Sequence, residues 1–168
     1  STGDKTFTAK WSAAVVYDIT YVLKDGTNDK DNPATYTVES AEIVLKNPTK
    51  AGYNFEGWEE GNTIAAGSTG DKTFTAKWSA AVEYTITYNL DNGVNDASNP
   101  SKYTIESPTI QLKAPTRTGY YFLGWTPTDN ILSGSTGDKA FTATWEKKTD
   151  LTLTANSDTL TYNGKEQS

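Results

Sequence analysis

The feature that most constrains the fold is a tandem repeat with a period of 67 residues. Trp11, Trp78 and Trp145 recur at that interval, and residues 12–78 align with residues 79–145 without a gap. In this alignment 39 of the 67 positions are identical. A repeat of fixed length marks one structural unit, so the chain is expected to contain two tandem modules, residues 12–78 and 79–145.

The segments outside the two modules differ from each other. The opening "STGDKTFTAKW" is identical to residues 68–78, so residues 1–11 are expected to be the closing strand of a truncated preceding repeat. This strand could pair with the first module or with another chain, or the physical boundary could differ from the sequence period. Residues 146–168 do not fit the repeat and are expected to be a linker and the start of a different β module.

Within each module the pattern is that of short strands. In "YTITYNL", residues 84–90, apolar and polar side chains alternate with the period of two that is typical of a half-buried strand. The following "DNGVNDASNP" is rich in turn residues and has room for a turn of helix at most. No segment longer than about ten residues has helical apolar spacing. A mainly β, small α+β fold is therefore predicted, with mixed sheets and little helix.

Aromatic residues near the end of each module are the predicted core. Most of them alternate with Thr or Lys, as buried strand residues do, and a module of this size needs dense packing to be stable. The predicted core residues are Tyr53, Phe55, Trp58, Phe74 and Trp78, with their equivalents Tyr120, Phe122, Trp125, Phe141 and Trp145.

One pair of positions that should be exposed is polar in the first module and apolar in the second. Asn54 and Glu56 of the first module become Tyr121 and Leu123 in the second. The strand face that should meet solvent is therefore apolar in the second module. Tyr121 and Leu123 are a candidate interaction patch for the next module or for a partner.

Composition excludes several classes of function. The chain has a net charge of -6 and contains no Cys, His or Met. An acidic surface disfavours nucleic acid, and no apolar run is long enough for membrane insertion. Without thiols or imidazoles the usual nucleophiles, general bases and zinc ligands are missing. We expect a protein that is not an enzyme and needs no cofactor.

Four motifs suggest chemistry but have simpler explanations. "GSTGDKT" at residues 67–73 resembles a phosphate loop, but an Asp precedes its Lys and a strand should follow. "DGTNDKDN" at residues 25–32 offers calcium ligands, yet the second module loses one carboxylate there. The pair Glu59-Glu60 becomes Thr-Pro in the second module, which indicates a solvated surface. Lys, Asn and acidic residues for an isopeptide crosslink are present, but no spacing selects a triplet.

The motifs of both modules resemble a known family. "YTITYNL", "APTRTGYYFLGW" and the closing "FTATW" of residues 84–145 are similar to the Listeria-Bacteroides repeat, which includes the B repeat of internalin surface proteins. This resemblance implies ubiquitin-like β-grasp modules, arrayed in tandem on secreted or wall-attached bacterial proteins. Where the family commonly has "NGG" after the first strand, this chain has "DNGVND" and "KDGTND". The tail from Asp150 resembles the start of an MBG-type module.

Together these features predict an extracellular repeat segment that acts as a spacer or stalk and takes part in adhesion. The short "SAAV" connector, without a flexible linker, should limit the angles between neighbouring modules of the same protein. The alternative is a module that binds carbohydrate or a host protein through an exposed aromatic patch.

Overall fold

The computed structural model describes residues 3–149 of the 168-residue chain. Each module contains six short strands in the same order, and residues 3–149 contain no helix. The first module has β1 (Val16–Val22), β2 (Thr35–Thr37), β3 (Ile43–Val44), β4 (Phe55–Trp58), β5 (Thr63–Ile64) and β6 (Lys72–Trp78). The second has β7 (Tyr84–Asn89), β8 (Lys102–Tyr103), β9 (Ile110–Gln111), β10 (Tyr120–Thr126), β11 (Asn130–Ile131) and β12 (Lys139–Lys147).

A mixed four-stranded sheet organises each module. The strand order is β2-β1-β6-β4 in the first module and β8-β7-β12-β10 in the second. The first and last long strands, β1 with β6 and β7 with β12, run parallel at the centre of the sheet, and both outer pairs are antiparallel. A two-stranded sheet, β3 with β5 or β9 with β11, completes each module. The expected mainly β class with mixed sheets is confirmed.

The helical part of the small α+β prediction is absent from the described residues. The segment between β1 and β2 forms turns, and the chain between β2 and β4 contains the short β3 and extended loops. An isolated bridge between Thr27 and Thr49, repeated between Val94 and Thr116, connects these loops. Pro33 and Pro48 lack the amide that a helix needs at these places, and turn residues surround them.

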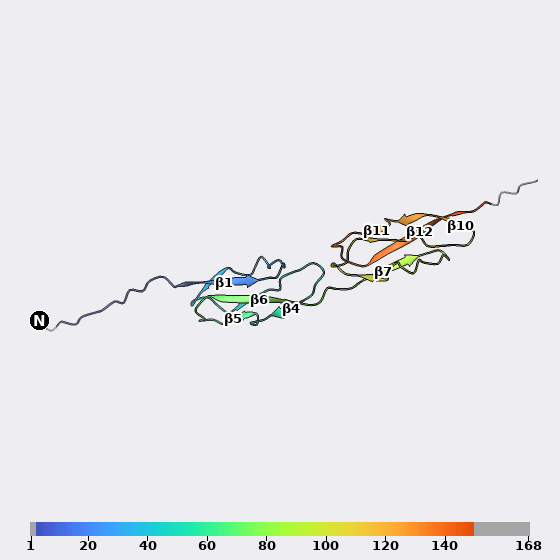
Figure 1. Ribbon diagram of the computed structural model, residues 1–168. Helices are drawn as coiled ribbons and strands as arrows, with labels where there is room; N and C mark the ends of the chain where they lie inside the picture. Colours follow the sequence, from blue (N-terminus) through green and yellow to red (C-terminus); the bar gives the residue numbers. More distant parts are fainter. Residues whose placement is uncertain (1–2, 150–168) are drawn as a thin grey trace, which may run out of the picture.

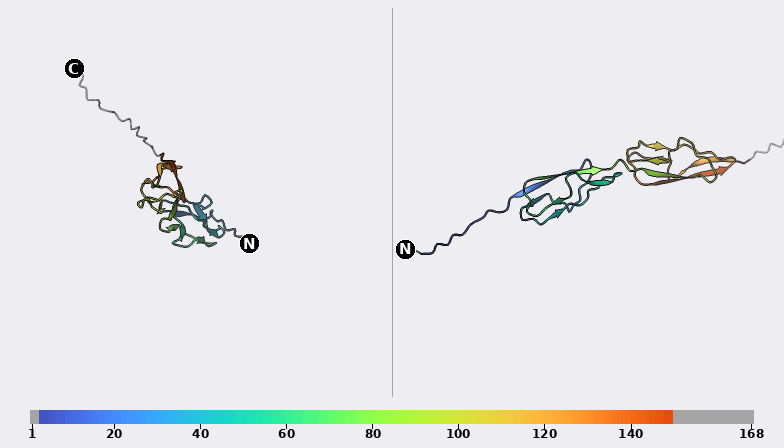
Figure 2. Two further views of the ribbon diagram at one scale, coloured as in Figure 1. Left: turned by 90° about the vertical axis from the view of Figure 1, so that its right-hand side faces the viewer. Right: turned by 90° about the horizontal axis from the view of Figure 1, so that it is seen from below.

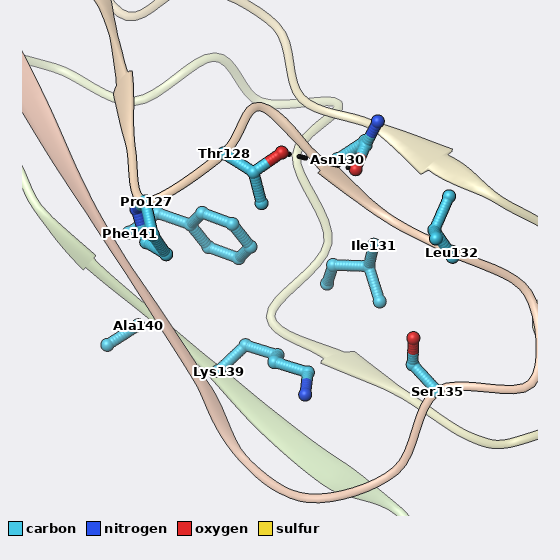
Figure 3. A pocket seen from close by; sticks show the side chains of 9 residues that line it. All are labelled: Pro127, Thr128, Asn130, Ile131, Leu132, Ser135, Lys139, Ala140 and Phe141. Atoms are coloured by element: carbon cyan, nitrogen blue, oxygen red, sulfur yellow. Dashed lines mark hydrogen bonds between the residues drawn. The ribbon is translucent and has the colours of Figure 1, made fainter.

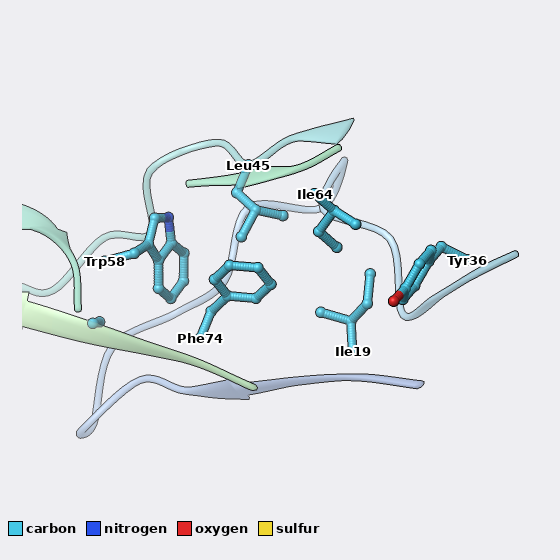
Figure 4. Close-up of a cluster of buried hydrophobic side chains, with 7 residues drawn as sticks. Ile19, Tyr36, Leu45, Trp58, Ile64 and Phe74 are labelled. Atoms are coloured by element: carbon cyan, nitrogen blue, oxygen red, sulfur yellow. The ribbon is translucent and has the colours of Figure 1, made fainter. Parts of the chain in front are cut away.

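Alternation along the strands produces one core per module. The first core consists of Ile19, Tyr36, Leu45, Trp58, Ile64, Phe74 and Ala76 (Figure 4). The second consists of the equivalent Ile86, Tyr103, Leu112, Trp125, Ile131, Phe141 and Ala143. In the first core the rings of Trp58 and Phe74 meet edge to face at 6.2 Å, an arrangement favoured by aromatic quadrupoles.

The predicted core residues occupy three kinds of position. Trp58, Phe74, Trp125 and Phe141 are buried in the two cores. Phe55, Trp78, Phe122 and Trp145 are half-buried and pack against the cores from one side. Tyr53, just after the turn that precedes β4, and Tyr120, the first residue of β10, are partly exposed and belong to neither cluster.

Residues 3–11 form no strand, and all of them are exposed. The exposed fraction reaches 90% for Phe7 and 91% for Trp11, so the segment does not pair with the first module. The two modules themselves lie end to end along one line (Figures 1 and 2). The MBG-like tail from Asp150 lies outside the described residues.

Candidate functional site

The phosphate-loop-like segment is a structural turn. The Asp71 carboxylate accepts a hydrogen bond from the backbone N–H of Asp18 at 2.9 Å, and Asp138 accepts one from Thr85 at 2.8 Å. The Tyr36 hydroxyl donates to the Gly70 carbonyl oxygen at 2.5 Å. These bonds tie the turn before β6 to β1 and β2, so the Asp that interrupts the phosphate-loop motif stabilises the sheet.

The acidic loop at residues 25–32 is held together by its own contacts. Asp31 lies 2.5 Å from the Lys30 ammonium and 2.6 Å from that of Lys46, and these two cations hold the pKa of Asp31 below its usual value. The Asn32 amide donates to the Asn28 side chain at 2.8 Å. Among the described residues no group of acidic side chains is arranged to hold a metal ion.

The carboxylates of Glu59 and Glu60 bind two different residues. Glu59 forms an ion pair with Lys24 at 3.0 Å. Glu60 accepts hydrogen bonds from the backbone N–H of Thr75 at 2.7 Å and from its hydroxyl at 3.0 Å. The backbone bond lowers the pKa of Glu60, because it stabilises the ionised form. Glu60 therefore supports the β4–β6 pair.

A shallow pocket opens beside β11 and β12 in the second module (Figure 3). Ile131 and Phe141 of the core form part of its wall, and Leu132 at its rim is 63% exposed. In the first module the equivalent pocket contains Glu60 in place of Pro127. The second pocket is the more apolar of the two.

The candidate patch Tyr121 and Leu123 lies on the outer face of β10. Their side chains are 58% and 63% exposed. The Lys148 ammonium lies 4.9 Å from the centre of the Tyr121 ring, within the range of a cation–π contact. The patch therefore presents an aromatic ring, an aliphatic side chain and one cation at the end of the second module.

A joint connects the two modules, and it was not predicted from the sequence. The Tyr53 hydroxyl of the first module donates a hydrogen bond to the Glu106 carboxylate of the second at 2.5 Å. This hydrogen bond raises the pKa of Tyr53, because it stabilises the protonated phenol. The Lys50 ammonium lies 4.4 Å from the centre of the Tyr53 ring. A polar contact between Tyr53 and Glu106 thus links one module to the next.

Beside this contact the Gly52 backbone lies close to the Ile105 side chain of the second module. Gly52 has a φ of 74°, and a Cβ atom placed on it would lie 2.7 Å from the Cβ of Ile105. The connector is fixed at the same place, because the Val82 N–H donates a hydrogen bond to the Gly52 carbonyl oxygen at 2.8 Å. Gly52 is buried, whereas the equivalent Gly119 is exposed. The second module therefore covers the glycine of the first.

The sequence repeats the parts of this joint in both modules without marking them as a joint. The Gly-Tyr pair is identical at residues 52–53 and 119–120, and the segments "TVES" and "TIES" at 37–40 and 104–107 differ by one methylene. Most of these residues are among the 39 of 67 aligned positions that are identical, so their agreement does not distinguish them from core residues. It does not reveal which two segments meet.

The described residues contain no helix that is long and apolar enough to cross a membrane. The family model of the Listeria-Bacteroides repeat domain matches residues 17–78 and 84–157. Among solved structures, domains 3-4 of the Streptococcal High Identity Repeats in Tandem (SHIRT) of a streptococcal cell surface protein share 16% sequence identity. That alignment covers 79% of this chain and 98% of the other, with a TM-score of 0.27. No curated protein sequence matches the chain at a significant level.

Proposed function

Because the chain belongs to the Listeria-Bacteroides repeat family, we propose that it is a non-enzymatic spacer or stalk segment of a bacterial cell-surface or secreted protein. Its partners in this role are the neighbouring repeat modules of the same protein. Its location is extracellular, where the segment holds a functional domain at a distance from the cell wall.

The joint is the observation that carries this proposal. A flexible linker would let two modules tumble independently. Here the connector has only four residues, 79–82, and its last residue is fixed to the first module by the hydrogen bond from the Val82 N–H to the Gly52 carbonyl oxygen. The Tyr53–Glu106 bond and the contact of Gly52 with Ile105 restrict bending further. Two modules that meet end to end with restricted bending make an extended, stiff unit.

The central parallel strands suit a segment under tension. The chain enters each module through β1 or β7 and leaves through β6 or β12, which are parallel neighbours. Tension on the two ends pulls these strands in opposite directions along their length. The hydrogen bonds of the ladder then resist together rather than one at a time, which slows forced unfolding.

A distance measurement between the modules tests the spacer function. The chain has no cysteine, so spin labels attach only at the equivalent loop positions Lys30→Cys and Ala97→Cys. We expect one narrow distance distribution, and a radius of gyration well above the roughly 15 Å of a compact globule of this length. A broad distribution, or a compact particle, would contradict the proposal.

Adhesion through the Tyr121 and Leu123 patch is a second candidate function. It is favoured by the exposure of both side chains where the first module has Asn54 and Glu56. The partner would be a glycan or a host surface protein, with Tyr121 stacking on a sugar ring or a side chain. Binding on a glycan or host-protein array that is lost in Tyr121→Ala would support it, and unchanged binding would exclude this patch.

A further inference from the structure

The acceptor half of the joint is a small loop tip, Ile105 and Glu106, at the entry end of the second module. The Thr104 N–H donates to the Ser107 hydroxyl oxygen at 3.0 Å, and the Glu106 N–H donates to the Thr104 hydroxyl oxygen at 3.2 Å. These local bonds preform the tip, so it does not need the first module to take its shape.

The first module carries the same tip, formed by Val38 and Glu39. Thr37 donates to Ser40 at 3.0 Å, and Glu39 donates to the Thr37 hydroxyl oxygen at 3.2 Å, as in the second module. Thr37 pairs with Val16, the first residue of β1, so this tip also lies at the entry end. Val38 is 45% exposed, and it is not among the nearest contacts of any described glycine, whereas Ile105 lies against Gly52.

The connector before the first module also matches the joint. Residues 12–15 and 79–82 are both "SAAV", and in the joint Val82 binds the Gly52 carbonyl oxygen. The exit of the second module is different. There Lys148, three residues after Trp145, donates to the Gly119 carbonyl oxygen, whereas Val82 is four residues after Trp78. The matching parts therefore lie on the entry side of the first module.

We propose that Val38 and Glu39 form the acceptor half of a second joint, occupied by the Gly-Tyr turn of another module of this repeat type that precedes residue 12. The tyrosine hydroxyl of that module donates to the Glu39 carboxylate, and its glycine packs against Val38. The proposal rests on the spacer function above and extends it, since one joint repeated at each step gives every module the same orientation to the next.

A three-module chain tests the proposal with native sequence. Residues 1–11 are identical to residues 68–78, so placing the sequence of residues 12–67 before Ser1 completes a module identical to the first. The single substitutions Val38→Cys and Ile105→Cys each place one thiol at a loop tip. The rate of thiol labelling then reports how accessible that tip is. The control is Val94→Cys in the second module, where Val94 is 68% exposed.

We expect labelling of Val38→Cys to slow severalfold when the third module is added, down to the rate of Ile105→Cys. The rate of Val94→Cys should not change. An unchanged rate at Val38→Cys, with Ile105→Cys still protected, would overturn the second joint and leave the spacer proposal intact. If Ile105→Cys reacts as fast as Val94→Cys in both chains, the first joint is open and both proposals fail.

A second measurement does not depend on labelling rates. Spin labels at Lys30→Cys of the first module and at the equivalent lysine of the added module should give the distance found between Lys30→Cys and Ala97→Cys. A different or broad distance would also overturn the proposal.

Discussion

At the scale of single residues, each module contains a glycine that makes room for a tryptophan. The Trp145 indole N–H donates to the Leu90 carbonyl oxygen at 3.1 Å, directly beside Gly93. A Cβ on Gly93 would lie 2.7 Å from the Trp145 ring and 2.9 Å from that carbonyl oxygen. Gly26 and Trp78 repeat this arrangement in the first module. The glycine of the "DNGVND" loop is therefore required by packing.

Gly93→Ala is predicted to destabilise the second module by about 1–3 kcal/mol, because neither the indole ring nor the carbonyl can move freely away. Denaturant unfolding followed by tryptophan fluorescence measures this loss. Gly3→Ala is the control, since Gly3 has no atom within 4 Å of an added Cβ. Equal stability of Gly93→Ala and the unchanged chain would show that the indole ring repacks.

Glu60 gives the first module a dependence on pH that the second module lacks at this position, where the residue is Pro127. The bond from the Thr75 N–H lowers the pKa of Glu60 below its ordinary value of 4.5. The stabilisation is thus complete above that ordinary value and is lost as the pH falls through the lower folded-state pKa.

Glu60→Gln is therefore predicted to weaken the first module at neutral pH, with a difference from the unchanged chain that shrinks as the pH falls below 4.5. Unfolding curves at a series of pH values measure this difference. Glu42→Gln, which changes an exposed glutamate of the same module, serves as the control. A difference that stays constant with pH would show that Glu60 acts without its charge.

At the scale of the elements, sequence patterns located the long strands but not their partners. The alternation in "YTITYNL" predicted β7 within a residue, because period two is a local property. The two-residue strands β5 and β11 are too short to carry any period. The parallel pairing of β1 with β6 joins segments about fifty residues apart, and no local pattern encodes that register.

Thr73→Pro tests the central position of β6. Proline removes an amide from a strand that has neighbours on both sides, so the first module should no longer fold cooperatively. Pulling single molecules from both ends should then give one unfolding peak instead of two. Thr6→Pro is a matched control, because residues 1–11 repeat the sequence of residues 68–78 but residues 3–11 form no strand. Two peaks in Thr73→Pro would contradict the predicted role of β6.

At the scale of the whole molecule, the proposed spacer function depends on the joint between two small folds. Each module has its own core, and the sequence predicted these cores because they depend on patterns within one module. The joint depends on how a turn of one module meets a loop of the next. Its parts, Tyr53 and Glu106, are 53 residues apart and carry no shared pattern, and the alternation around Tyr53 predicts a core position instead.

Two glycines separate the effect of the joint from the effect of backbone strain. Gly52 and Gly119 have φ values of 74° and 78°, so alanine is disfavoured at both and should cost each module about 1 kcal/mol or more. A Cβ on Gly52 would lie 2.6 Å from a methyl group of Ile105, whereas one on Gly119 would have nothing within 4 Å. Only the first substitution pushes the modules apart.

Gly52→Ala is therefore predicted to shift or broaden the distance distribution between labels at Lys30→Cys and Ala97→Cys, while Gly119→Ala leaves it narrow. The shift follows because the added methyl group must displace Ile105 and, with it, the entry end of the second module. Unfolding curves of both variants check that alanine lowers the stability of the two modules by a similar amount. If both variants give the same distribution, the contact between Gly52 and Ile105 does not set the angle between the modules, and the connector alone must do so.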